Sequence, residues 1–63
     1  MKTIKDHKGK IYYIQTRHLS SISESTVCYT EGDEDKPTTE LIICGGFIYI
    51  EASLDDVVQQ LGI

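Results

Sequence analysis

The chain has 63 residues, with six basic and ten acidic side chains and a formal net charge of -4. Chains shorter than ~70–80 residues rarely gain more than ~3–5 kcal/mol from their core, so we expect one small domain over residues 1–63 and no second core. Hydrophobic residues make up 40% of the chain and charged residues 25%, which indicates a folded globular protein and excludes a disordered one.

The first half of the chain predicts short strands. A polar turn at residues 6–9 separates residues 3–5 from residues 10–16, and the second segment is rich in β-branched and aromatic side chains, so the two should form a hairpin. Residues 17–20 are expected to bend and residues 22–30 to form a third strand. The polar segment 31–37 is expected to be an exposed loop that ends at Pro37, because proline cannot join a central ladder.

The clearest local signal lies in residues 41–50, where Gly45-Gly46 separates two apolar runs. Both central positions of a type I′ turn need positive φ, so the glycines predict a hairpin turn that places Cys44 opposite Phe47 and Glu40 opposite Glu51. Alternation then assigns two faces. The first is purely aliphatic and is expected to be core: Leu41, Ile43, Ile48 and Ile50. The second carries Glu40, Ile42, Cys44, Phe47, Tyr49 and Glu51.

The C-terminal segment predicts a helix. Ser53 is a natural N-cap, Asp55 and Asp56 follow in the first turn, and Gly62 suits the position after the last turn. One apolar stripe, expected to rest on the aliphatic face of the last hairpin, follows the helical spacing i, i+3, i+4 and i+7: Leu54, Val57, Val58 and Leu61.

Together these elements predict an α+β fold that is mostly β, an antiparallel meander of about five short strands with one C-terminal helix. One short helix covers one face, so the second face of the last hairpin needs another cover. Either the N-terminal strands curl round it into a small open barrel, or it meets another molecule. Because a 63-residue core is marginal alone, we expect a homodimer that buries this face.

The charge is unevenly distributed along the chain. Residues 1–18 carry five basic residues and one acidic residue, a net charge of +4, whereas residues 19–63 carry one basic and nine acidic residues, a net charge of -8. The two parts either neutralise one another, within the fold or between subunits, or the acidic part faces a basic partner.

Little in the sequence supports catalysis or cofactor chemistry. His7 and His18 have no metal spacing with Cys28 or Cys44, no serine lies in a nucleophile elbow, and no pocket of ~300 Å³ is expected on so small a frame. We therefore expect no enzyme activity and no cofactor. The N-terminus has no apolar region typical of a signal peptide and the longest apolar stretch is too short to span a membrane, so we expect a cytoplasmic protein with reduced, packed cysteines.

A pattern of residues runs from the glycine turn at Gly9 to the end of the helix. It comprises Ile14, Leu19 and Ile22, then Gly46 before the apolar run 47–50, then Ser53 opening a helix with Asp55, Asp56, Val57 and Leu61. This pattern resembles the small flagellar FlbD-like proteins, and the end of LytTR-type DNA-binding domains is similar. The resemblance implies a strand meander with a C-terminal helix and no catalytic residues. The acidic segment 31–36 departs from the FlbD-like pattern.

These observations predict a small non-catalytic protein-binding module that acts as a regulator or inhibitor. In one concrete form of this hypothesis, a phage or mobile element encodes the module, and the acidic surface of the module occupies the binding surface of a host nucleic-acid-binding protein. Two alternatives stay open: a self-associating structural subunit, and a nucleic-acid-binding protein that uses Lys8, Lys10, Tyr12, Tyr13 and Arg17. The expected protein-binding residues are Glu31, Asp33, Glu34, Asp35, Ile42, Phe47 and Tyr49.

Overall fold

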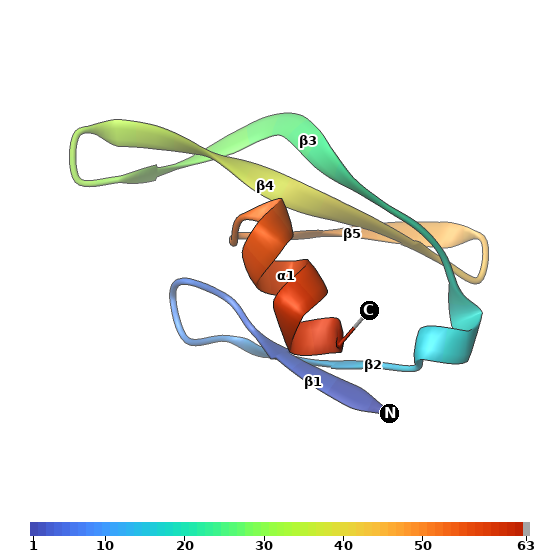
Figure 1. Ribbon diagram of the computed structural model, residues 1–63. Coiled ribbons are helices and arrows are strands. Elements are labelled where there is room, and N and C mark those ends of the chain that lie inside the picture. The colour runs from blue at the N-terminus through green and yellow to red at the C-terminus, as the bar shows by residue number, and fades with distance from the viewer. Residues whose placement is uncertain (63) are drawn as a thin grey trace.

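The computed structural model describes residues 1–62, which fold into two antiparallel sheets and one helix (Figure 1). The elements in chain order are β1 (Lys2–Lys5), β2 (Ile11–Ile14), a short 3-10 helix (Thr16–His18), β3 (Leu19–Glu31), β4 (Glu34–Ile43), β5 (Gly46–Ile50) and α1 (Leu54–Leu61). β1 pairs with β2, and β4 lies between β3 and β5 in the second sheet. The mostly β, α+β fold expected from the sequence is confirmed, and the two sheets do not close into a barrel.

The helix begins and ends where the sequence predicts. The Ser53 side chain accepts a hydrogen bond from the Asp56 amide at 3.2 Å, and Gly62 ends α1 in the left-handed conformation with φ 76°. Val57 and Leu61 are fully buried, and Leu54 and Val58 beside them are half-buried.

The core lies between the two sheets, with α1 in it. Its buried side chains come from both sheets and from the C-terminal segment: Ile4, Ile14, Leu41, Ile50, Ala52, Val57 and Leu61. The helix therefore covers the β1–β2 hairpin as well as the aliphatic face of the last hairpin, on which alone it was expected to rest. One helix packs against two sheets because the chain turns at residues 15–18 and places the second sheet on the other side of α1 (Figure 1).

The last hairpin has the predicted faces but a different turn. Ile43 pairs with Gly46, so the turn residues are Cys44 with φ 46° and Gly45 with φ 81°. The prediction that Gly45-Gly46 forms the turn, with Cys44 opposite Phe47 and Glu40 opposite Glu51, is wrong. Glu40 pairs with Tyr49 instead. The residues on each face are nevertheless those predicted, because the observed partner of every β4 residue differs from the predicted one by two positions, which preserves the alternation.

The acidic segment forms part of a long hairpin rather than the expected loop. β3 and β4 pair to the end of the hairpin, where Glu31 lies opposite Glu34, and the turn consists of Gly32 and Asp33 alone. Pro37 lies within β4. β5 ends opposite Thr39, so on that side Pro37 has no neighbouring strand and its missing N–H leaves no ladder bond unmade.

The β1–β2 turn is organised by Asp6, a carboxylate that no sequence pattern singled out. Asp6 is 7% exposed, and its Oδ1 accepts hydrogen bonds from the amides of Lys8 at 3.0 Å and Lys10 at 2.8 Å. The Tyr12 hydroxyl donates to Oδ2 at 3.4 Å. Aspartate commonly closes turns in this way, because its short side chain reaches amides two residues on.

Candidate protein-binding surface

Three of the predicted binding residues form an exposed apolar surface on the three-stranded sheet. Phe47 is 60% exposed, Tyr49 38% and Ile42 37%, although Ile42 lies directly opposite Phe47 across the β4–β5 pair. The rings of Phe47 and Tyr49 meet edge to face with centroids 5.3 Å apart, a favourable aromatic geometry. We call Ile42, Phe47 and Tyr49 the outer apolar face. The helix lies on the opposite side of this sheet and leaves the outer apolar face uncovered.

The acidic residues of the predicted site lie at the free end of the β3–β4 hairpin. We call Glu31, Asp33, Glu34 and Asp35 the acidic hairpin end. Strands rise ~3.3 Å per residue, so Glu34 and Ile42 are separated by about 26 Å along β4. The structure thus places the two predicted groups on one sheet but does not bring them together.

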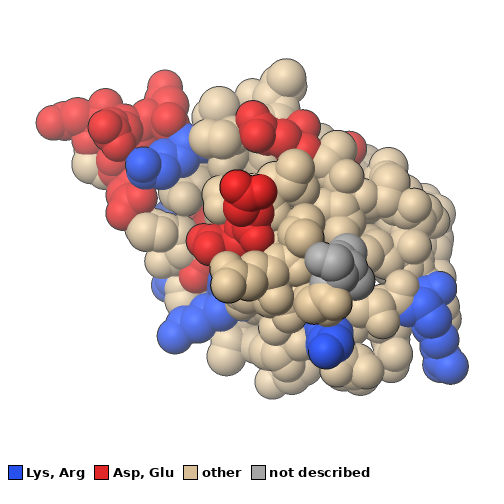
Figure 2. Space-filling model, in the orientation of Figure 1, with Lys and Arg blue, Asp and Glu red and all other residues tan. Residues whose placement is uncertain are grey.

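Three residues of the acidic hairpin end have polar partners within the fold, and one of these partners, Lys36, is a cation. His7 Nε2 contacts Glu31 Oε1, Lys36 Nζ lies 3.1 Å from Glu34 Oε2, and the Thr30 hydroxyl donates to Asp35 at 2.9 Å. The hydrogen bond and charge of Glu34 raise the pKa of Lys36. Figure 2 shows acidic side chains concentrated toward one end of this view and basic ones mainly along the opposite edge.

The basic N-terminal part meets the acidic part at the end of β5. Lys8 Nζ lies 3.2 Å from Glu51 Oε2, and the His7 amide donates to the Glu51 carbonyl at 2.9 Å. With the His7–Glu31 contact, these bonds fasten the β1–β2 turn against the three-stranded sheet. Neutralisation within the fold, one of the two expectations for the charge asymmetry, therefore takes place at the Lys8–Glu51 pair.

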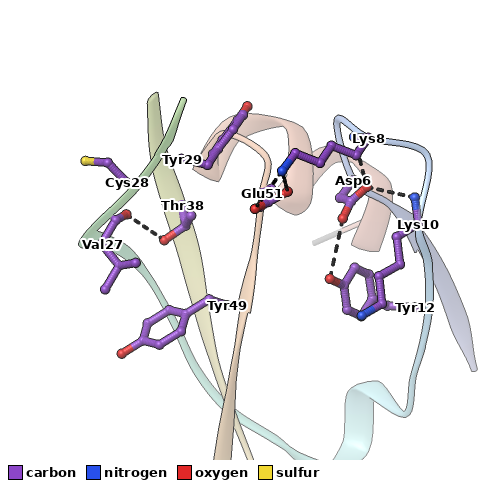
Figure 3. Close-up of a pocket in the computed structure, with 10 residues that line it drawn as sticks. All are labelled: Asp6, Lys8, Lys10, Tyr12, Val27, Cys28, Tyr29, Thr38, Tyr49 and Glu51. Carbon is purple, nitrogen blue, oxygen red and sulfur yellow. Dashed lines mark hydrogen bonds and ion pairs between the residues drawn. The ribbon is translucent and has the colours of Figure 1, made fainter. Parts of the chain in front are cut away.

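A groove of about 410 Å³ lies between the two hairpins (Figure 3), contrary to the expectation that the frame is too small for one. We call it the interhairpin groove. Its lining residues come from three segments far apart in the sequence: Asp6, Lys8, Lys10 and Tyr12 from the β1–β2 hairpin, Val27, Cys28, Tyr29 and Thr38 from β3 and β4, and Tyr49 and Glu51 from β5 and beyond.

Burial and nearby carboxylates raise the pKa of two groove phenols, Tyr12 and Tyr29. Burial, then the charge and hydrogen bond of Asp6, raise the pKa of Tyr12 above its ordinary value of 10.0. Burial and then Glu31 raise the pKa of Tyr29. Lys10 Nζ lies 5.2 Å from the centroid of the Tyr12 ring, a cation–π distance. Tyr12 and Tyr29 therefore offer neutral aromatic surface, and Asp6, Lys8 and Glu51 beside them already have polar partners.

The residues of the nucleic-acid alternative are dispersed. Tyr12 and Tyr13 are neighbours on β2, so they point to opposite faces; Tyr12 packs against the core, and Tyr13 is 70% exposed on the outer side. Lys8 is paired with Glu51, and Arg17 lies in the 3-10 helix beyond the other end of β2. These side chains do not form one continuous platform.

The side chains that could bind a metal ion are also dispersed. Among residues 1–62, no group of three or more His, Cys, Asp or Glu side chains is placed to hold a metal ion. Cys28 and Cys44 are free, as expected, but both are exposed, so the prediction that they pack inside is wrong. No helix in the part of the chain that the structure describes is long and apolar enough to cross a membrane.

Sequence reasoning missed most of the interhairpin groove. Val27 and Tyr29 were assigned to a strand, and Asp6 and Lys8 to a turn, with no signal that these segments meet. The alternation of polar and apolar side chains in 26–30 could have shown that Val27 and Tyr29 share a face, but not what lies opposite.

Comparison with protein-family models, with curated proteins and with solved structures finds no match to this chain.

Proposed function

We propose that this chain is a small non-catalytic protein-binding module that acts as a regulator or inhibitor by occupying a surface of another protein. The observation that carries the proposal is the outer apolar face. Ile42, Phe47 and Tyr49 expose neighbouring aromatic and aliphatic side chains on paired strands, while the core is filled from the other side of the sheet. Contiguous apolar patches of this kind are typical of protein interaction sites.

The charge of the acidic hairpin end supports a basic partner surface. Asp33 lies in the exposed turn, and Glu34 and Asp35 are exposed beside it with one neighbouring lysine, Lys36. Acidic side chains there would steer a basic surface toward the sheet without themselves supplying most of the affinity. A nucleic-acid-binding protein of a host cell, met by a phage- or mobile-element-encoded inhibitor, is one partner with such a surface.

Affinity capture with matched variants tests the proposal. Phe47→Ser removes the most exposed apolar side chain of the outer apolar face, and Tyr13→Ser removes a comparably exposed aromatic from the other sheet. A partner retained by the parent and by Tyr13→Ser, but lost from Phe47→Ser, supports it. A partner retained equally by both variants would contradict it. The triple variant Asp33→Ser, Glu34→Gln, Asp35→Ser then measures the steering contribution, which should shrink as salt rises.

Self-association is the second candidate function. The Ile42–Phe47 pair favours it, because a two-fold interface joins a patch to its own copy and a compact apolar pair suits that arrangement. Light scattering over a concentration series distinguishes the candidates. A dimer that Phe47→Ser converts to a monomer supports self-association, whereas a parent that stays monomeric at the highest concentration rules it out.

A further inference from the structure

The interhairpin groove has the size and lining of an anchor site. Its volume of about 410 Å³ lies within the range of ~300–1,000 Å³ typical of binding clefts. Tyr12, Tyr29 and Tyr49 give it aromatic walls, and Val27 adds an aliphatic side chain. Tyrosines supply large contact areas at low entropic cost, which is why they are frequent at binding hot spots.

The walls of the groove are held in place by polar contacts. The Lys8–Glu51 pair spans the groove from the β1–β2 turn to the residue after β5, as Figure 3 shows. Asp6 fixes the turn behind Lys8, and the Thr38 hydroxyl donates to the Val27 carbonyl at 2.8 Å on the other wall. No buried side-chain N or O atom in residues 1–62 lacks a partner. A preorganised site of this kind loses little entropy when it binds.

The groove continues into the outer apolar face on one side and toward the acidic hairpin end on the other. Tyr49 belongs both to the groove and to the outer apolar face. Toward the other side, Tyr29 lies opposite Lys36, and two residues further along β3 Glu31 lies opposite Glu34. Residues two apart in extended chains are spaced about 7 Å. An extended segment whose apolar side chain enters the groove can therefore set a residue two positions away over the acidic hairpin end.

We propose that the interhairpin groove is the anchor site for an extended basic segment of a partner protein, with an apolar side chain packed in the groove beside Tyr29 and a Lys or Arg facing the acidic hairpin end. This inference rests on the proposed function and names the partner's chemistry. Of the groove's own lysines, Lys8 is paired with Glu51, and Lys10 lies over the Tyr12 ring on the other side of the groove from Tyr29 (Figure 3).

The backbone beside the groove favours recognition through side chains rather than by strand addition. Beyond β5, the edge of β4 toward the groove includes Pro37, which has no N–H to donate. A partner strand could not complete a ladder along this edge. The segment is therefore expected to bind through its anchor and its charge, in the manner of peptides that dock in aromatic-lined grooves.

Selection from a random peptide display library, followed by titration of the enriched peptides, tests the inference. Enriched peptides should combine an apolar residue with Lys or Arg two positions away. Their Kd should weaken at least tenfold in Tyr29→Ser, which removes a side chain that lines the groove, and less than threefold in Phe47→Ser, which removes a side chain that does not line it. Replacing the peptide's Lys or Arg by Glu should weaken binding at least tenfold. Backbone amide shifts in the parent should map to Tyr12, Tyr29 and Thr38, which also locates the site if Tyr29→Ser folds poorly.

The other outcomes contradict the inference in distinguishable ways. Peptides whose shifts map to Ile42 and Phe47 and whose binding survives Tyr29→Ser would overturn the groove assignment and leave the proposed function standing. Enrichment of acidic peptides, or of none, would overturn the inference, and the absence of any enriched peptide would also count against the proposed function. Groove shifts that depend on protein concentration without peptide would identify a second copy as the occupant and overturn it as well.

Discussion

The side chain of Gln60 on α1 forms two hydrogen bonds with the backbone of Lys5 on β1. Its Oε1 accepts from the Lys5 amide at 2.8 Å and its Nε2 donates to the Lys5 carbonyl at 3.1 Å. The amide side chain thus pairs with β1 as a neighbouring strand would. These bonds join the two ends of the chain and cover part of an exposed strand edge, which otherwise is open to pairing with other chains.

Replacing Gln60 should therefore weaken the whole fold. Each hydrogen bond contributes ~0.5–1.5 kcal/mol, so Gln60→Ala is expected to lower the free energy of unfolding by about 1–2 kcal/mol. Gln59→Ala, at an exposed neighbour whose side chain forms no hydrogen bond within residues 1–62, is the matched control and should change it by less than ~0.5 kcal/mol. Urea unfolding measures both. Equal losses would show that the Gln60 bonds contribute nothing beyond helix propensity.

Asp6, the one acidic residue among residues 1–18, is expected to stabilise the fold more than an exposed carboxylate does. Asp6→Ala leaves the amides of Lys8 and Lys10 and the Tyr12 hydroxyl without their acceptor, at an expected cost of about 2–3 kcal/mol in the free energy of unfolding. Asp33→Ala, in the exposed turn of the other hairpin, should cost less than ~0.5 kcal/mol. If urea midpoints of the two variants coincide, Asp6 does not organise this turn.

The two neighbouring glycines of the last hairpin should respond oppositely to alanine. Gly45 has φ 81° and open space where an alanine Cβ would lie, so Gly45→Ala costs about 1 kcal/mol or more from backbone conformation alone. Gly46 lies in β5, where a Cβ would lie 3.8 Å from the Ile43 carbonyl oxygen, an ordinary contact. Gly46→Ala is therefore neutral or stabilising by about 0.5 kcal/mol. Thermal unfolding of the two variants tests the position of the turn. Equal destabilisation by both substitutions would support the turn at Gly45-Gly46 that the sequence predicted.

Tyr12 should make stability depend on alkaline pH. Because the pKa of Tyr12 is raised in the folded chain, the unfolded chain releases this proton first as pH rises. The stability that the neutral phenol confers is fully present below the unfolded pKa of about 10 and is lost as pH passes through the folded pKa. Tyr12→Phe should flatten this loss in urea unfolding between about pH 9 and 12, and Tyr13→Phe, at the exposed neighbour, serves as the control. An unchanged slope in Tyr12→Phe would contradict the burial of this hydroxyl against Asp6.

The faces of the last hairpin could be predicted from the sequence, but the exact turn could not. Leu41 and Ile50 are buried and Phe47 is exposed as expected, because alternation depends only on odd and even positions. The turn was misplaced because Cys44 adopts a left-handed conformation that a non-glycine residue seldom takes. The two-residue shift in pairing also removed the expected Glu40–Glu51 contact.

The contacts between distant segments could not be predicted at all. Polar residues 34–36 were assigned to a loop because no apolar alternation marks a strand that is exposed on both faces, although β4 continues through them. The Lys5–Gln60 bonds and the Lys8–Glu51 pair join residues whose separation exceeds forty positions. No local pattern encodes such pairs, and the interhairpin groove likewise lies between segments that are far apart in the sequence.

A photo-crosslinker placed at Phe47 tests the central claim, that the outer apolar face contacts another protein, most directly. A benzophenone amino acid would replace Phe47 in one variant and Tyr13, the exposed aromatic of the other sheet, in the matched control, both expressed in cells that naturally contain the chain. We expect irradiation to join the chain to a protein of different mass at position 47 and not at position 13. Equal crosslinking at both positions, or none at position 47, would contradict the claim.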